Sequence, residues 1–532
     1  MDQERTSRNS KLGKSKACLN CRRRKVRCDG KKPTCTPCER FIGGGLHDCE
    51  YTETGPAQSQ VLEEQISIIQ SRIRELEQPS EKTSVGLHNP YQSSHRRGSS
   101  FDEFAPGPST SISRTPILQP HSPELFKTLM NTFLRHSSQV GFFLNPKMFD
   151  NLSNGAAPSQ IACPALLDAV YLWGAHLSRS AAISVHEASL LSNALHSATR
   201  GLSSDSCPNA IRQTIQAEML LAQYFFRNAR MLEGKYHASA AVSIVLSSGF
   251  HKIRSAERPV GPISPAPNSL NEGESINAFW AVLTLNNTWL AADGSPRDVS
   301  SAVVDTPWPL DIHAYSQEPE LLPSHSNSTI ESFLSNVSDR GTSLVALHAK
   351  AAIAFEQASR LARFTENIAL QNPETLATEF SNLEKVIVAL GRLLPPLEQN
   401  GSHSLPLVIH SLVQVAIIQV HNPFVFKHAV SRSRSLTAAM AVVKFVRQTN
   451  LSGLEYIDAI VGTLWMAACQ VFITELSRPE YGPTGTENHN HAKFHEAVET
   501  LLAAMSAFAG DCRMIELQLE TAQRNYHAIG NP

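Results

Sequence analysis

Six cysteines lie within 32 residues near the N-terminus, and their spacing is the strongest constraint in the sequence. They follow the pattern C-x2-C-x6-C-x6-C-x2-C-x10-C, whereas the other four of the ten cysteines are scattered. Two residues between paired cysteines let both thiolates face one tetrahedral zinc ion. Six thiolates are too many for one such ion and too few for two separate ones. The pattern therefore predicts two zinc ions that share two bridging thiolates, with these ligands: Cys18, Cys21, Cys28, Cys35, Cys38 and Cys49.

The small size of this cysteine-rich module explains why it needs metal. A segment of 32 residues buries too little apolar surface to fold unaided, so metal binding should supply its folding free energy. A disulfide knot is the alternative. The first thirty residues are charged throughout and contain no apolar run of signal-peptide length. We therefore expect a reducing compartment, in which zinc ligation is favoured over disulfides.

Charge is distributed as unevenly as cysteine. The formal net charge is -1, yet residues 11–32 hold ten Lys and Arg and one acid, which leaves -10 for the rest of the chain. Such a concentrated basic segment indicates a polyanionic partner. A merely solvated charge run is the alternative. Hydrophobic residues at 42% and charged residues at 18% exclude a wholly disordered chain and a protein that spans the membrane many times.

Two runs of residues within this segment resemble a known family, the fungal binuclear zinc cluster transcription factors. The run Cys18-Leu-Asn-Cys-Arg-Arg-Arg-Lys-Val-Arg-Cys-Asp29 is similar to that family's first half, and Lys32-Pro-Thr-Cys-Thr-Pro-Cys38 to its second half. The resemblance implies that Cys18 and Cys35 are the bridging ligands and that a short helix follows each cysteine pair. One departure is the last gap, which has ten residues where the family usually has six to eight.

The same resemblance assigns roles to the basic residues. It implies that Lys25 and Arg24 reach base edges of a CGG-like triplet in the major groove, where guanine O6 and N7 accept hydrogen bonds from Lys or Arg. Other basic residues would neutralise phosphates, namely Arg22, Arg23, Arg27, Lys31 and Lys32. Three lysines of the arm could add to a nuclear import signal: Lys11, Lys14 and Lys16.

A short apolar repeat follows the cysteine-rich module. Its members are spaced by four, three, four and three residues: Leu62, Ile66, Ile69, Ile73 and Leu76. Isoleucine at heptad position a and mostly leucine at position d suit a parallel two-stranded coiled coil, so this stripe predicts a dimerisation helix. An amphipathic helix docked on the C-terminal region is the alternative, because two heptads are few.

The remaining sequence indicates a mainly α protein with a large helical region. A regular apolar stripe runs from Leu376 to Leu394 and stops at Pro395, and clear strand alternation is nearly absent. The stretch from Ala459 to Thr474 is too short to span a bilayer, so we interpret it as a buried helix. The predicted organisation is a basic flexible arm (1–17), the zinc cluster (18–49), a linker (50–60), the coiled-coil helix (61–78), a disordered Ser- and Pro-rich linker (79–123) and an all-helical domain (124–532). This last domain resembles the regulatory domain of the same fungal family, which implies a regulatory role.

These features, together with the family resemblance, predict a zinc-dependent, sequence-specific DNA-binding regulator of RNA polymerase II transcription. We expect a nuclear homodimer on double-stranded DNA, with transcription co-regulators as further partners, two structural zinc ions and no membrane association. A zinc-stabilised scaffold that binds protein or RNA without reading bases is the alternative. An enzyme is a third hypothesis, but the sequence holds no nucleophile elbow, H-E-x-x-H motif or Walker loop, so no catalytic residue is predicted.

Overall fold

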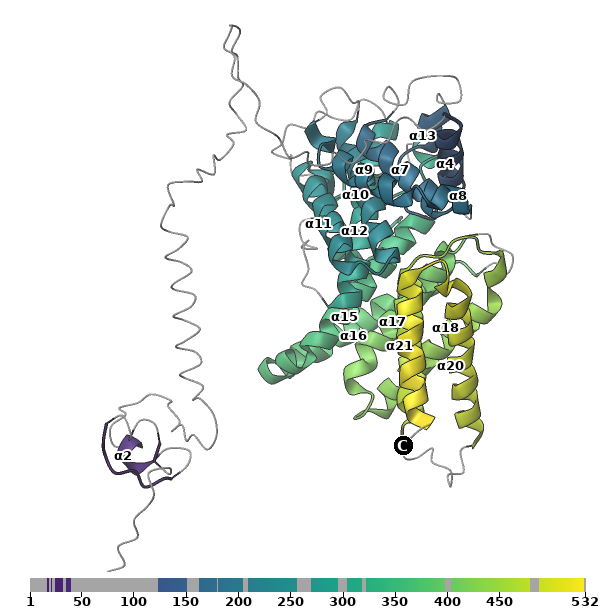
Figure 1. The fold of residues 1–532 in the computed structure, drawn as a ribbon. Coiled ribbons are helices and arrows are strands. Elements are labelled where there is room, and N and C mark those ends of the chain that lie inside the picture. Colours follow the sequence, from purple (N-terminus) through teal and green to yellow (C-terminus); the bar gives the residue numbers. More distant parts are fainter. Residues whose placement is uncertain are drawn as a thin grey trace, which may run out of the picture. The chain divides into compact units, whose positions relative to one another are not determined.

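The computed structural model (Figure 1) divides the chain into two compact units, Met1–Ser111 and Ile112–Pro532. Each unit is described by itself. The residues that the structure describes are 17–18, 21, 24–31, 35–39, 123–150, 162–178, 180–203, 209–255, 269–294, 304–317, 322–397, 403–478 and 488–530. The predicted coiled coil (61–78) and Ser- and Pro-rich linker (79–123) lie outside these residues, except for Pro123.

Helices dominate the second unit. The described part of the first unit carries α2 (Thr36–Glu39). The α-helices of the second unit are α4 (Pro123–His136), α7 (Pro164–His176), α8 (Ala181–Ser184), α9 (Glu187–Ala198), α10 (Ala210–Arg227), α11 (Met231–Ser247), α12 (Ser269–Asp293), α13 (Ala314–Gln317), α14 (Thr329–Leu334), α15 (Leu344–Gln371), α16 (Pro373–Leu393), α17 (Leu405–His421), α18 (Ala429–Gln448), α19 (Ile460–Leu476), α20 (Asn488–Ala509) and α21 (Arg513–Gly530). Short 3-10 turns are η1 (Pro146–Phe149), η2 (Gly201–Ser203), η3 (Phe250–Lys252), η6 (Asn422–Phe424) and η7 (Leu451–Gly453).

The long helix α15 links two groups of helices in the second unit. It has 28 residues and packs on α12 from the earlier group and on α16 and α17 from the later group. Figure 1 shows the earlier group, α4 to α12, in blue to teal and the later group, α16 to α21, in green to yellow. Contacts of α10 with α21 and of α12 with α19 also join the groups. The second unit is therefore one helical body rather than two separate bundles.

Helix α16 confirms the stripe predicted from sequence. It begins where the Asn372 side chain accepts a hydrogen bond from Thr375 N at 3.2 Å, with Pro373 in the first turn, and such an N-cap satisfies a backbone donor that would otherwise lack a partner. Of the stripe, Leu376, Ile387 and Leu390 are buried. The helix ends at Leu393, before the two prolines, because proline cannot continue it.

The two most apolar helices, α17 and α19, lie in the core. Helix α19 is buried along most of its length and confirms the helix expected from Ala459 to Thr474. Among the described residues, one segment, Leu405–Phe424, is long and apolar enough by composition to cross a membrane, and most of it is buried in the protein. A buried core helix has the same composition, so this segment is weak evidence for a membrane span.

The core of the second unit is continuous and rich in aromatic side chains. All five tryptophans of the chain are buried: Trp173, Trp280, Trp289, Trp308 and Trp465. Buried indole N–H groups usually need acceptors; Trp173 Nε1 donates to Leu220 O at 2.8 Å and Trp280 Nε1 to Pro307 O at 2.7 Å. The described residues contain one isolated bridge, between Ser255 and Ser326, and no strand. The mainly α fold class is thus confirmed.

Candidate zinc cluster and nucleic-acid interface

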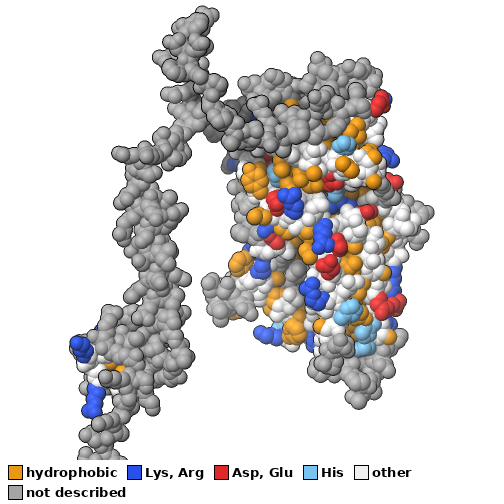
Figure 2. Space-filling model, viewed as in Figure 1, with side chains coloured by type: hydrophobic (Ala, Val, Ile, Leu, Met, Phe, Trp, Pro, Cys, Tyr) orange, Lys and Arg blue, Asp and Glu red, His pale blue; other side chains and the backbone are white. Residues whose placement is uncertain are grey.

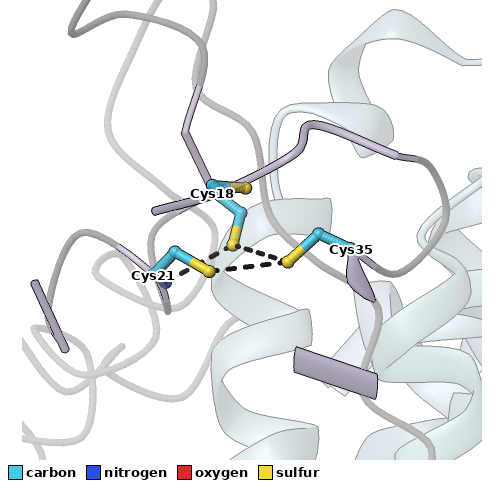
Figure 3. Close-up of side chains that lie close together, drawn as sticks. Cys18, Cys21 and Cys35 are labelled. Carbon is cyan, nitrogen blue, oxygen red and sulfur yellow. Dashed lines mark hydrogen bonds between the residues drawn. The ribbon is translucent and has the colours of Figure 1, made fainter. Parts of the chain in front are cut away.

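The sulfur atoms of the N-terminal cysteines converge on one point (Figure 3). The Sγ–Sγ distances are 3.7 Å between Cys18 and Cys35 and 3.5 Å between Cys21 and Cys35. Cys38 Sγ lies 3.8 Å from Cys18 Sγ and 3.7 Å from Cys21 Sγ. Cys28 completes a group with Cys18, Cys21 and Cys35 whose sulfur atoms all lie within 4.8 Å of one another. Five of the six predicted ligands therefore come together, and Cys49 lies outside the described residues.

These distances fit tetrahedral zinc ligation and not disulfides. Zinc binds thiolate at about 2.3 Å, which places two sulfurs of a tetrahedron about 3.8 Å apart. A disulfide would bring two sulfurs to about 2.05 Å, and the described cysteines are all free. Thiolates are soft ligands that suit zinc. The disulfide-knot alternative is thus excluded for the described cysteines.

The backbone supports the first cysteine pair. Cys21 N donates to Cys18 Sγ at 3.4 Å, which favours the thiolate form of that sulfur. Burial raises the pKa of the Cys18 and Cys21 thiols. These thiols are consequently protonated without metal at neutral pH, and a metal ion that binds them must displace protons.

A side-chain contact ties the two halves of the cluster together. The Asp29 carboxylate, directly after the third cysteine, accepts hydrogen bonds from Thr36 N at 3.1 Å and from Thr36 Oγ1 at 2.5 Å. Thr36 is the first residue of α2, whose N-terminal N–H groups lack partners within the helix. The hydrogen bond from Thr36 holds the pKa of Asp29 below its ordinary value. The Asp29 carboxylate, which belongs to the first half of the cluster, therefore helps to position the second half.

Lys25 has a left-handed backbone conformation that side chains other than glycine rarely adopt. Its φ is 54°, and the next residue, Val26, donates its backbone N–H to Cys21 O at 3.1 Å. This 6→1 hydrogen bond with a left-handed residue before the donor is a Schellman motif, which ends a helical turn. A lysine there costs on the order of 1 kcal/mol relative to glycine, so the position favours a role for the side chain.

The described basic side chains of the cluster all face solvent. Arg24, Lys25, Arg27 and Lys31 are exposed, and Figure 2 shows blue side chains standing out from the first unit. They lie on the segment between the first C-x2-C pair and the second. Because the sulfur atoms of both pairs come together, the two ends of this segment are held close to each other. The other predicted phosphate contacts, Arg22, Arg23 and Lys32, lie outside the described residues, as does the whole apolar repeat of Leu62, Ile66, Ile69, Ile73 and Leu76.

Comparison with known proteins agrees with this geometry. Residues 16–56 match the family described as the fungal Zn(2)-Cys(6) binuclear cluster domain. They are therefore a fungal-type binuclear zinc cluster, with two structural zinc ions. Within that class, the chain is 55% identical over 40 residues to the "C6 finger domain transcription factor hasF" of Aspergillus fumigatus. That match covers 8% of this chain and 5% of the relative, and no solved structure matches the chain.

Sequence reasoning missed two features of the first unit. The contact between Asp29 and Thr36 had a local signal, because a carboxylate and a threonine beside a short helix are common capping residues. The left-handed conformation of Lys25 had none, since lysine does not favour it. The conformation accompanies the backbone hydrogen bond from Val26 N to Cys21 O, which closes the turn.

Proposed function

We propose that this chain is a zinc-dependent, sequence-specific DNA-binding regulator of RNA polymerase II transcription that acts in the nucleus. The cluster would read CGG-like triplets in the major groove. Within it, Lys25 and Arg24 would contact base edges, and Arg22, Arg23, Arg27, Lys31 and Lys32 would contact phosphates. The name of the Aspergillus relative, a transcription factor, supports the general function.

One observation carries this proposal: four exposed basic side chains stand on a short segment held by converging thiolates. Phosphate contacts supply affinity and register, while base contacts supply specificity, and a reader needs both on one rigid element. Lys25 follows the end of a helical turn, where a long side chain can extend beyond the helix. A solvated charge run would not require a strained lysine at that point.

The zinc in this proposal is structural. All six cysteines would act as ligands, with Cys18 and Cys35 as the bridges; their sulfurs lie 3.7 Å apart, close enough to share two ions. Two tetrahedral ions that share six thiolates leave no open position for water, and an open position is what catalytic zinc requires. We therefore propose a regulator and not an enzyme.

The remaining parts of the proposal concern assembly. Residues 61–78 would form a parallel two-stranded coiled coil, so that two clusters bind two half-sites, with residues 50–60 setting their spacing and orientation. Residues 79–123 would be a linker and residues 124–532 a regulatory domain that contacts co-regulators. The first and second compact units are consistent with this division.

An unbiased DNA selection with the full-length protein tests the proposal. Sites are enriched from random duplexes at near-physiological salt, once with zinc bound and once after chelation. We expect paired CGG-like triplets at one fixed spacing, lost on chelation. Enrichment of single triplets would support base-specific DNA recognition and contradict the proposed homodimer.

The interaction-scaffold hypothesis predicts a different result from the same selection. A well-folded, zinc-loaded protein that enriches no sequence, yet binds polyanions with a steep salt dependence, is a non-specific binder. That outcome would overturn base-specific recognition and leave the cluster as a protein- or RNA-binding module.

A further inference from the structure

The second unit contains a partly open cavity that the DNA-binding proposal does not use. Its volume is about 230 Å³, which is below the range of drug-sized sites and suits one aromatic ring with a short chain. The walls come from the segment between α4 and η1, from α10, α12 and α15, from the start of α17 and from the segment before α19. A ligand there would touch both groups of helices that α15 links.

One side of the cavity is aromatic and held in place by ring stacking. Trp280 and Trp289 line it from α12. The Trp280 ring stacks on Trp308 with centroids 4.4 Å apart, and the Trp289 ring stacks on Phe226 at 4.2 Å. Because these partners fix the indole rings, this wall exists before any ligand binds. An apolar ligand body would therefore bind without the cost of ordering the side chains.

Several polar groups of the lining lack hydrogen-bond partners. The half-buried His348 ring forms no hydrogen bond with a described residue. The amide oxygens of Gln139 and Gln223 accept no hydrogen bond within the same described set. Protein groups left unpaired in this way cost free energy unless a ligand or water satisfies them. Two of the three are acceptors, so the cavity favours a ligand that donates hydrogen bonds.

The charged side chains that line the cavity are acidic. It contains the carboxylates of Asp311 and Asp458 and, among the described residues, no lysine or arginine. Burial lowers the pKa of His348 to about 4, so its imidazole is neutral at pH 7. The Asp458 carboxylate accepts one hydrogen bond, from Ile460 N at 3.0 Å, and forms no ion pair with a described residue. Burial raises the pKa of Asp458, whereas the hydrogen bond from Ile460 N and the charge of Arg227 lower it. An ammonium group in the cavity would favour the ionised carboxylate in the same direction as Arg227.

We propose that this cavity binds a small organic amine, with its apolar body against Trp280 and Trp289 and its ammonium group paired with Asp458. A cation near indole faces gains further attraction from the rings. A carboxylic acid of the same shape would meet two carboxylates and is excluded. This proposal does not depend on DNA recognition, and its test contains no DNA.

Isothermal titration calorimetry of the full-length, zinc-loaded protein with three matched probes tests the ligand class. The probes are phenethylamine, 2-phenylethanol and phenylacetate, which share a ring and differ in the charge of the head group. We expect phenethylamine to bind at least about tenfold more tightly than 2-phenylethanol. This affinity ratio corresponds to about 1.4 kcal/mol of binding free energy, which one well-placed charge interaction can supply. Phenylacetate should not bind. Equal affinities for all three, or no saturable binding of phenethylamine at millimolar concentration, would overturn the proposal.

Two variants test the location. Asp458→Asn keeps an oxygen that can accept from Ile460 N, and it should reduce phenethylamine affinity to that of 2-phenylethanol. Asp511→Asn removes an exposed carboxylate outside the cavity and should change nothing. Ala281→Phe places a ring in the cavity from α12 and should abolish binding of both neutral and cationic probes while thermal unfolding remains cooperative. Undiminished binding in Ala281→Phe would place the amine elsewhere and reject the site, even if Asp458→Asn failed to fold.

Discussion

The Asp29 carboxylate accepts two hydrogen bonds from Thr36, one from its backbone N–H at 3.1 Å and one from its hydroxyl at 2.5 Å. The contact joins the residue after Cys28 to the residue after Cys35. Within the described part of the cluster, this contact connects the two halves by protein hydrogen bonds and does not require a metal ion. It gives the module some preorganisation before both zinc ions are in place.

Removal of this link should weaken metal binding. We expect Asp29→Ala to lower zinc affinity several-fold, because the first turn of α2 loses its acceptor, whereas Asp29→Asn should retain most of the affinity. Competition with a chromophoric chelator measures the difference. Equal affinity in wild type and Asp29→Ala would mean that metal ligation alone positions the second half.

Two substitutions of Lys25 separate the strain of its backbone conformation from the DNA contact of its side chain. Lys25→Gly relieves the left-handed conformation, so this variant should be more stable than Lys25→Ala by on the order of 1 kcal/mol. Both variants should lose about 1 to 3 kcal/mol of preference for the CGG-like site. Chelator competition and binding to matched and scrambled duplexes measure the two effects.

Arg22→Ala serves as the comparison for Lys25, because a phosphate contact carries no sequence information. It should weaken binding to all duplexes alike and reduce the dependence of affinity on salt. A uniform loss for the Lys25 variants as well would contradict the division between base and phosphate contacts.

The proposed coiled coil can be broken without touching the cluster. Ile66 and Ile73 changed together to Asp place charges at both a positions, and these should prevent dimerisation. Sedimentation and gel-shift measurements should then show a monomer that binds one half-site and forms no two-site complex. A persistent two-site complex would place the dimer interface elsewhere in the chain.

At Gly174, α7 lies directly against the backbone of α4. A Cβ at this position would clash with the Leu129 carbonyl group, and backbone atoms cannot yield as a flexible side chain can. Gly174→Ala should therefore lower the free energy of unfolding by about 3 kcal/mol. Gly510→Ala is the matched control, because nothing lies within 4 Å of its added Cβ. Denaturant unfolding of both variants measures the contrast, and equal stabilities would show that α4 can shift at little cost.

His348 should make the second unit sensitive to acid. Its pKa falls from 6.5 to about 4 in the folded protein because burial disfavours the imidazolium. The unfolded state therefore binds more protons between these values, and stability falls as the pH drops from 6.5 to 4. Relative to His348→Asn, the wild type should lose about 3 kcal/mol of unfolding free energy between pH 7 and 4. Tryptophan fluorescence reports this unfolding specifically, because every tryptophan of the chain lies beyond residue 123. Parallel pH profiles of the two proteins would contradict the assignment.

Local patterns predicted a large part of the fold. Helix α16 follows from an apolar stripe bounded by Asn372 and two prolines, and α19 from a continuous apolar run. Both signals depend on residues within a few turns of one another, so the sequence alone suffices. The same holds for the cysteine pairs, because C-x2-C spacing itself directs two thiolates toward one ion.

The amine cavity could not be predicted in this way. Trp280 and Trp289 are buried like the other tryptophans, and nothing in the sequence indicates that these two line a cavity. His348 and Asp458 are separated by 110 positions (348 to 458), and no periodicity connects them. They share one cavity because α15 packs between the two groups of helices.

The sequence by itself determined the chemistry of the N-terminal unit, namely six thiolates at zinc-ligand spacing and a basic segment between the cysteine pairs, and the mainly helical character of the rest. Only the tertiary structure decided that Asp29 reaches Thr36, that Lys25 adopts a left-handed conformation, and that unpaired polar groups from distant helices meet around one cavity. The reason is physical. Ligand spacing and helix periodicity are local properties of the chain, whereas hydrogen bonds across a loop and gaps between packed helices depend on how distant segments fit together.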